Sequence, residues 1–254
     1  MNGPARLDPR ALARETLRRL RSLRNPDAAR SGQRFFKEPV ALLGIGAQTL
    51  DRLAKELIKR TRAEWSWKDA ALFSDSLAED PHLEARTVGY SLVASFVDRA
   101  EPALFPRIRG WLEKSCGNWA AVDTLAPRVL GPFLDRYPAR IREVIRWTKS
   151  ENLWLRRGAI VAFVPHARKG KHLDAVYTIA ERLLEDEEDL IHKAVGWVLR
   201  EAGKADAARL ERFLRKHGPR IPRTTLRYAI ERFPETKRKQ ILEATRAARR
   251  PGSR

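Results

Sequence analysis

Apolar side chains recur at intervals of three and four residues along almost the whole chain. This spacing places them on one face of an α-helix, whereas a half-buried strand alternates apolar and polar residues. Short alternating runs of β-branched residues bounded by Asn-Gly or Asp-Gly turns do not occur. The pattern therefore predicts an all-α protein.

Prolines mark the starts of several predicted helices. Proline suits the first helical position because its missing N–H would have no partner there. Five dipeptides fit this role: Asp8-Pro9, Asp80-Pro81, Glu101-Pro102, Tyr137-Pro138 and Phe233-Pro234. The periodicity between them accommodates roughly a dozen helices of ordinary length, joined by short turns.

Helix pairs recur at a spacing of roughly 40 residues, which is the period of HEAT and armadillo repeats. We therefore expect a curved α-solenoid of HEAT-like antiparallel helix pairs, with a compact helical bundle as the alternative. A chain of 254 residues is compatible with one extended repeat domain. We assign residues 1–244 to that domain and residues 245–254 to a basic, flexible tail.

The chain is strongly basic. Its 51 Lys and Arg residues outnumber 32 Asp and Glu residues, which gives a net charge of +19. Residues 204–254 alone hold 16 basic and 5 acidic residues, and most of this segment keeps a helical apolar stripe. A folded basic face is explained most simply by a polyanionic partner, and the concave side of a solenoid suits a duplex. We therefore expect duplex DNA as the partner.

Composition argues against several classes of protein. No run of 18 or more apolar residues exists, so no membrane partner is expected. The single Cys116 excludes an intramolecular disulfide and a four-cysteine metal site. We expect a cytoplasmic monomer, nucleoid-associated when bound to DNA, with neither metal nor cofactor. The histidines show no metal-ligand spacing; they are His82, His166, His172, His192 and His217.

One glycine-rich segment resembles a nucleotide loop only superficially. Gly44-Ile45-Gly46 lacks the preceding strand, the third glycine and the basic residue of such loops. The segment therefore predicts a tight turn.

Two tryptophans lie at the margins of predicted apolar faces. Trp197 belongs to a helix over residues 190–201, where it lies beside Lys193 and Arg200 at 100° per residue. Trp119 and Asp123 are four residues apart and therefore share one flank of a helix. The structural alternatives are a tryptophan that covers a helix–helix seam and an aspartate that serves a helix start or a salt bridge.

Arg157 is predicted to point into the apolar sector of its helix, toward Leu153 and Ile160. A buried guanidinium must meet a carboxylate or a bound anion. Asp123 and a DNA phosphate are both candidates for that partner. The neighbouring Arg156 is predicted to lie at the surface.

Several segments resemble the AlkD-like DNA alkylation repair family, which are HEAT-like DNA glycosylases. Residues 190–201 resemble the family's most characteristic helix, and residues 152–160 resemble the helix that carries its DNA-contacting arginine. The Trp119 to Asp123 segment resembles its Trp-x-x-x-Asp pair. Leu43-Gly44-Ile45 with Leu53-Ala54 resembles its N-terminal signature, so the resemblance spans about residues 33–233.

The resemblance implies a monofunctional glycosylase that removes cationic N3- and N7-alkylated purines from duplex DNA. It implies that Asp123 is the catalytic carboxylate and that Trp119 and Trp197 line the site around the lesion's deoxyribose. A carboxylate and aromatic faces stabilise the oxocarbenium-like sugar that base loss creates. Neither a deep base pocket nor a lysine nucleophile is expected. The expected DNA-binding residues are Arg156, Arg157, Lys193, Arg200, Arg223 and Arg227.

Two alternatives without catalysis stay open. A HEAT scaffold could hold damaged or branched DNA, or RNA, on its basic face. A protein–protein scaffold explains the repeats but not the charge. Release of free 7-methylguanine from methylated DNA distinguishes the glycosylase from the binding module.

The basic composition predicts that duplex affinity falls steeply with salt. Each phosphate that the protein neutralises releases counterions, so log K should fall by roughly 0.9 per contacted phosphate for each tenfold rise in salt. Sequence should matter little. Titrations of one duplex at several salt concentrations measure the slope, and a flat response contradicts the assignment of a nucleic-acid partner.

Overall fold

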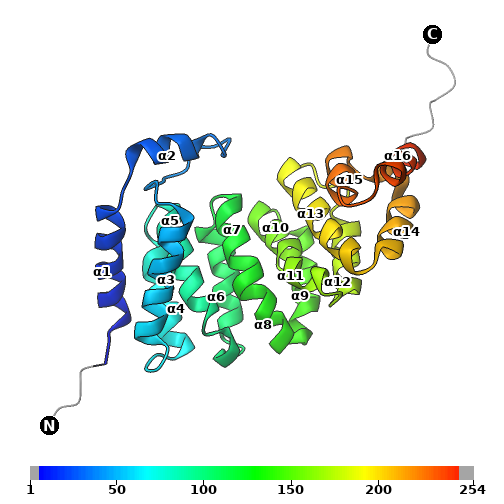
Figure 1. The fold of residues 1–254 in the computed structure, drawn as a ribbon. Coiled ribbons are helices and arrows are strands. Elements are labelled where there is room, and N and C mark those ends of the chain that lie inside the picture. The colour runs from blue at the N-terminus through cyan, green and yellow to red at the C-terminus, as the bar shows by residue number, and fades with distance from the viewer. Residues whose placement is uncertain (1–5, 246–254) are drawn as a thin grey trace. The chain divides into compact units, whose positions relative to one another are not determined.

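The computed structural model describes residues 6–245, and every regular element in this range is helical (Figure 1). Sixteen α-helices lie within the range, which confirms the predicted all-α class. None of the helices between residues 6 and 245 combines the length and apolar character needed to cross a bilayer. The predicted tail falls almost wholly on residues 246–254, which lie outside the described residues.

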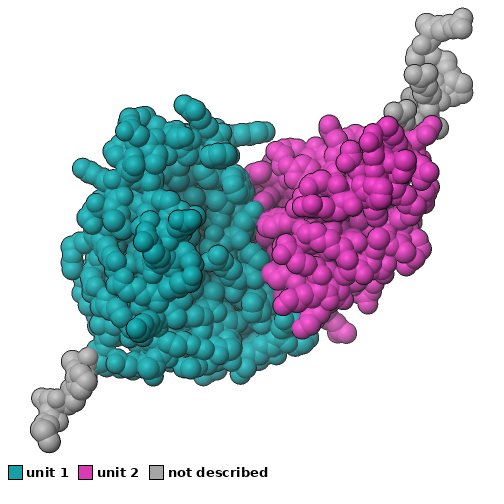
Figure 2. Space-filling model, viewed as in Figure 1, with its two compact units in different colours: residues 1–138 teal, residues 139–254 magenta. Residues whose placement is uncertain are grey.

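The chain divides into two compact units, Met1–Pro138 and Ala139–Arg254 (Figure 2). The assignment of residues 1–244 to one domain stays a prediction. The helices of the first unit are α1 (Pro9–Ser22), α2 (Pro26–Gln33), α3 (Ala47–Thr61), α4 (Trp67–Ala78), α5 (Leu83–Ala94), α6 (Leu104–Gly110), α7 (Trp119–Leu125) and α8 (Gly131–Arg136). Those of the second are α9 (Ile141–Arg146), α10 (Leu153–Val161), α11 (Val164–Arg168), α12 (Leu173–Arg182), α13 (Asp189–Ala205), α14 (Ala207–His217), α15 (Arg223–Ala229) and α16 (Glu235–Ala244).

The first unit is built from two rows of packed helices. In one row α3 packs on α5 and α5 packs on α7, and in the other α1 packs on α4 and α4 on α6. The two rows meet where α4 packs on α5, its neighbour in sequence. Each helix therefore buries one apolar stripe against its pair and another against the next pair, as repeat proteins do. The largest fully buried side chains include Phe73, Tyr90 and Phe133.

The second unit repeats this arrangement. One row consists of α10, α13 and α15, with α13 in contact with both neighbours. The other row contains α9, α12, α14 and α16, and α12 and α14 both pack on α13. The segment from α14 to α16 is helical up to Ala244, which confirms a folded basic segment up to that residue.

Proline marks helix starts less sharply than predicted. Pro9 is the first residue of α1, where the Asp8 carboxylate accepts hydrogen bonds from the N–H groups of Arg10 and Ala11. The prediction is wrong by two residues at Pro81 and Pro102, since α5 begins at Leu83 and α6 at Leu104. Pro138 begins a 3₁₀ turn, and Pro234 immediately precedes α16. Proline fixes only its own φ, so it is equally compatible with the turn that leads into a helix.

Gly44 lies in the connection between α2 and α3, where residues 39–46 form neither a turn nor a bend, so the predicted tight turn is wrong. Its φ of +77° lies in the left-handed region. The buried Glu84 carboxylate accepts hydrogen bonds from the N–H groups of Gly44 and Ile45, at 2.8 and 3.3 Å. A carboxylate of the protein thus occupies the position that an anion would take in a phosphate-binding loop. This contact favours a structural role for the segment over phosphate binding.

Gly44→Ala should destabilise the fold strongly. A Cβ at this position would lie 2.1 Å from the carbonyl oxygen of Asn25 and would occupy a left-handed conformation. We expect a loss of at least ~2 kcal/mol in the free energy of unfolding, measured by denaturant titration. Gly110→Ala is the matched control, because that residue is helical and a Cβ there meets nothing within 4 Å. Equal stability of the two variants would contradict the required conformation at Gly44.

Candidate active site

The predicted Trp119 and Asp123 pair lies on α7. Trp119 is the first residue of the helix, and the Asn118 side chain caps it by accepting a hydrogen bond from the N–H of Ala121 at 3.0 Å. Val122 and Leu125 are fully buried, whereas Trp119 and Asp123 are half-buried. The helix therefore anchors one face in the core and leaves an indole and a carboxylate at the edge.

The helical segment widens immediately after this pair. Pro127 has no N–H, so the α-helical hydrogen bond from residue 127 to the carbonyl of Asp123 cannot form. The chain follows a π-helix over Ala126–Leu130 and then returns to α-helix in α8. Such wide turns occur frequently at functional sites. Pro127 could have been recognised from the sequence, because it lies four residues after Asp123.

An aromatic residue that the sequence did not reveal covers Trp119. Phe36 stacks on the Trp119 ring, with centroids 5.2 Å apart and planes at 23°. The Gln33 amide holds the turn that carries Phe36, because it donates to the Glu38 carbonyl and accepts from the N–H of Val40, both at 2.9 Å. No periodic pattern identifies Phe36, because it lies in a segment without regular structure.

Arg157 is buried, as its position on the helix predicted. Its side chain extends from α10 and donates from Nη1 to the carbonyl of Leu190 at 2.5 Å. Leu190 lies in the first turn of α13, so this hydrogen bond ties the two helices together. The predicted pairing of Arg157 with Asp123 or a phosphate stays a prediction.

Trp197 lies in the middle of α13 and is half-buried, at the margin of the core as predicted. The cations beside it are already paired. Lys193 bonds to Asp189 at 2.7 Å, and this hydrogen bond raises the pKa of Lys193. Arg200 pairs with Glu231. Both cations are available to DNA only if they exchange these carboxylates for phosphates.

The backbones of α13 and α15 approach closely at Gly196. A Cβ at this position would lie 2.5 Å from the Cβ of Tyr228 and 2.8 Å from the carbonyl oxygen of Thr225. The Thr225 hydroxyl also donates to the carbonyl of His192 at 3.0 Å. This close packing fixes α15, whose Arg223 and Arg227 are exposed, beside the helix that carries Trp197.

The exposure of Arg156 differs from the prediction. Only 15% of its side chain is exposed, and two of its nitrogens bond to the Asp186 carboxylate at 2.7 and 3.4 Å. Nη1 also donates to the carbonyls of Ser150 and Glu151. The expectation of a plainly exposed Arg156 is therefore wrong. The sequence could not reveal the reason, because Asp186 is 30 residues away.

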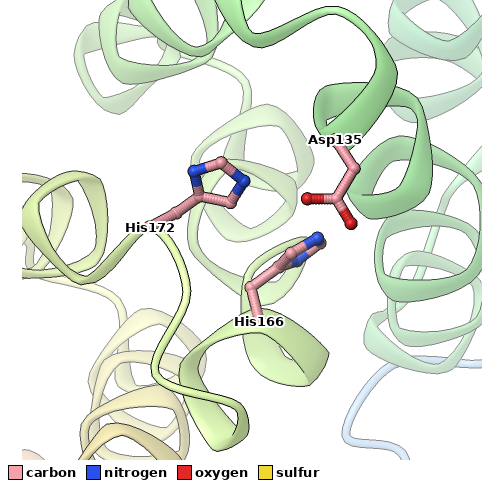
Figure 3. Close-up of side chains that lie close together, drawn as sticks. All are labelled: Asp135, His166 and His172. Atoms are coloured by element: carbon pink, nitrogen blue, oxygen red, sulfur yellow. The ribbon is translucent and has the colours of Figure 1, made fainter.

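The chain also holds a buried cysteine and a pair of neighbouring histidines. Cys116 is buried, which raises the pKa of its thiol to about 12, so it is not a thiolate nucleophile at neutral pH. The His166 and His172 rings lie side by side in the second unit, with centroids 5.2 Å apart (Figure 3). The pair by itself is a contact between α11 and the residue preceding α12.

The predicted site residues fall into two sets. Trp119 and Asp123 lie on the α3–α5–α7 row of the first unit. The residues on the α10–α13–α15 row of the second are Arg156, Arg157, Lys193, Trp197, Arg200, Arg223 and Arg227. That the two sets act on one substrate stays a prediction.

Packed helix pairs, with the candidate polar and aromatic residues on one row of each unit, define an all-helical protein of the repeat type. The sequence profile of the DNA alkylation repair enzyme family matches residues 16–233, so the chain belongs to this family. A solved structure described as a predicted DNA alkylation repair enzyme from Enterococcus faecalis superposes with a TM-score of 0.74. It is 19% identical, and the match covers 84% of this chain and 97% of that chain, which shows a shared fold. No curated protein matches the sequence.

Arg156→Ala should lower stability, because it leaves the buried Asp186 carboxylate without its guanidinium. We expect a loss of about 2–4 kcal/mol in the free energy of unfolding. Adding Asp186→Asn should recover part of the loss, because it removes the unpaired charge. Denaturant titrations of both variants test this. An Arg156→Ala variant that melts like the wild type and binds DNA more weakly would support the original expectation.

Proposed function

We propose that this chain is a DNA glycosylase that hydrolyses the N-glycosidic bond of cationic N3- and N7-alkylated purines in duplex DNA. The observation that carries the proposal is the half-buried carboxylate of Asp123, one helical turn from Trp119. Phe36 extends the aromatic surface by stacking on that indole. Membership of the DNA alkylation repair enzyme family supports the choice of DNA as substrate.

The chemistry requires the bond between C1′ and the purine nitrogen to break while water adds to C1′. The base leaves with the bonding electron pair, which neutralises its positive charge, and the sugar passes through a cationic, oxocarbenium-like state. The Asp123 carboxylate stabilises that cation electrostatically, and the faces of Trp119 and Trp197 contribute through cation–π attraction. An alkylated purine is already a good leaving group, so moderate stabilisation is sufficient.

In this proposal the cations of the α10–α13–α15 row bind the DNA backbone. Arg223 and Arg227 are exposed on α15 and can meet phosphates directly. Lys193 can exchange Asp189 for a phosphate at small cost, because surface ion pairs contribute only about 0–1 kcal/mol. Arg200 is a weaker candidate, because only 20% of its side chain is exposed and it lies 3.6 Å from the buried Glu201 carboxylate. Arg156 is a weaker candidate than expected, since it would have to leave Asp186.

Asp123→Asn should abolish most excision and leave binding intact. The substitution keeps the shape of the side chain and removes its charge, which is needed most in the transition state. We expect the single-turnover rate on a 7-methylguanine duplex to fall by about 10²–10³-fold with little change in duplex affinity. Neutral uracil should not be released by either protein.

Asp51→Asn is the matched control, because Asp51 is an exposed aspartate on α3, in the same row as α7, and pairs only with Lys55 among the described residues. It should excise at the wild-type rate. Unchanged excision by Asp123→Asn would overturn the catalytic role. A wild-type protein that binds duplex DNA but releases no 7-methylguanine would instead be a noncatalytic binding module.

A further inference from the structure

A hollow between α12 and α14 has no role in the proposed excision. It has a volume of about 360 Å³ and lies within the second unit. Its lining residues all come from these two helices, which belong to the row that does not carry Arg157 and Trp197. The volume is at the lower end of the range for small-molecule sites.

Aromatic rings form one wall of the hollow. Tyr177 lies against Phe213 with centroids 5.1 Å apart, and Phe213 lies against His217 at 4.4 Å. All three residues are buried. Such a wall suits a flat heterocycle, because stacking of a nucleic-acid base on an aromatic side chain contributes about 1–3 kcal/mol.

Two buried polar atoms in this wall make no hydrogen bond with any residue in the described range: the Tyr177 hydroxyl and Nε2 of His217. The nearest carboxylate oxygen to Nε2, from Glu181, is 3.7 Å away. Burial raises the pKa of Tyr177 to about 12 and lowers the pKa of His217, so both groups are neutral at pH 7. Buried polar atoms without partners are costly, and a ligand with a polar edge would satisfy them.

Three cations and two carboxylates line the hollow. Arg212 is exposed and has no ion pair with any residue between 6 and 245. Lys216 is also exposed and lies 3.7 Å from the Glu181 carboxylate, a surface pair that a phosphate can replace at small cost. The Arg209 guanidinium covers the Tyr177 ring at 4.6 Å while it pairs with the exposed Asp174. Such a surface pair breaks at little cost, so Arg209 can move aside when a ligand enters.

We propose that this hollow binds a nucleoside monophosphate. The base stacks on the Tyr177 and Phe213 wall, and its polar edge meets the Tyr177 hydroxyl and His217. The phosphate pairs with Arg212 and Lys216 at the opening. The combination of aromatic wall, neutral polar atoms and free guanidinium matches the three parts of a nucleotide better than it matches a phosphate alone. The site is separate from the proposed excision chemistry.

Calorimetric titration of the full chain with dAMP tests the proposal, with 2′-deoxyadenosine and inorganic phosphate as comparison ligands. We expect one saturable dAMP site. Tyr177→Phe should weaken dAMP binding about 2–10-fold, the effect of one lost hydrogen bond. This variant removes a hydroxyl that has no partner in the fold, so its melting temperature should not fall.

Arg212→Gln should weaken dAMP binding and leave binding of 2′-deoxyadenosine unchanged, because only the phosphate is affected. Arg215→Gln is the matched control on the same helix, since Arg215 pairs with Glu211 and does not line the hollow. The proposal is overturned if dAMP does not bind, or if neither Tyr177→Phe nor Arg212→Gln weakens its binding. Equal affinity for inorganic phosphate and dAMP would also overturn it.

Discussion

Each helix in the two rows must bury apolar surface on two sides, against its partner in the pair and against the next pair along the row. A single helix pair cannot satisfy this requirement alone, which is why repeats of this kind are stable only when stacked. In the second unit α13 shows the constraint most clearly, because it packs on α10, α12, α14 and α15. The polar residues of interest occupy the narrow margins that this packing leaves. Their positions are therefore fixed by the core rather than by flexible loops.

The same packing decides what the sequence could predict. Trp197 and Trp119 were placed correctly at the core margin, because helical periodicity alone determines which flank a residue occupies. The burial of Arg157 followed from the same geometry. Arg156 was misplaced because its partner comes from a segment distant in sequence, and Phe36 was missed because it lies outside any helix. Periodicity therefore predicts the direction in which a side chain points from its own helix. It does not predict contacts between segments that are distant in sequence.

Net charge describes this surface poorly at the level of single residues. Many basic side chains bond to carboxylates on neighbouring helices, as Arg60 does with Glu15 and Arg19 with Glu56. These pairs hold adjacent helices in register while leaving the protein with a large positive excess. The cations that can bind a polyanion are those that form no such ion pair or whose ion pair breaks at a small cost in free energy. Arg212, Arg223 and Arg227 meet that description better than Arg156.

The π-helical turn after Asp123 also changes the rotational phase of the chain. A π-turn inserts one residue into the helical path, and one residue corresponds to a rotation of about 100°. The side chains of α8 therefore point in directions that a continuous α-helix starting at Trp119 would not give them. Phe133 and Leu134 are fully buried on this reset helix. The inserted residue therefore sets the direction from which these two side chains enter the core.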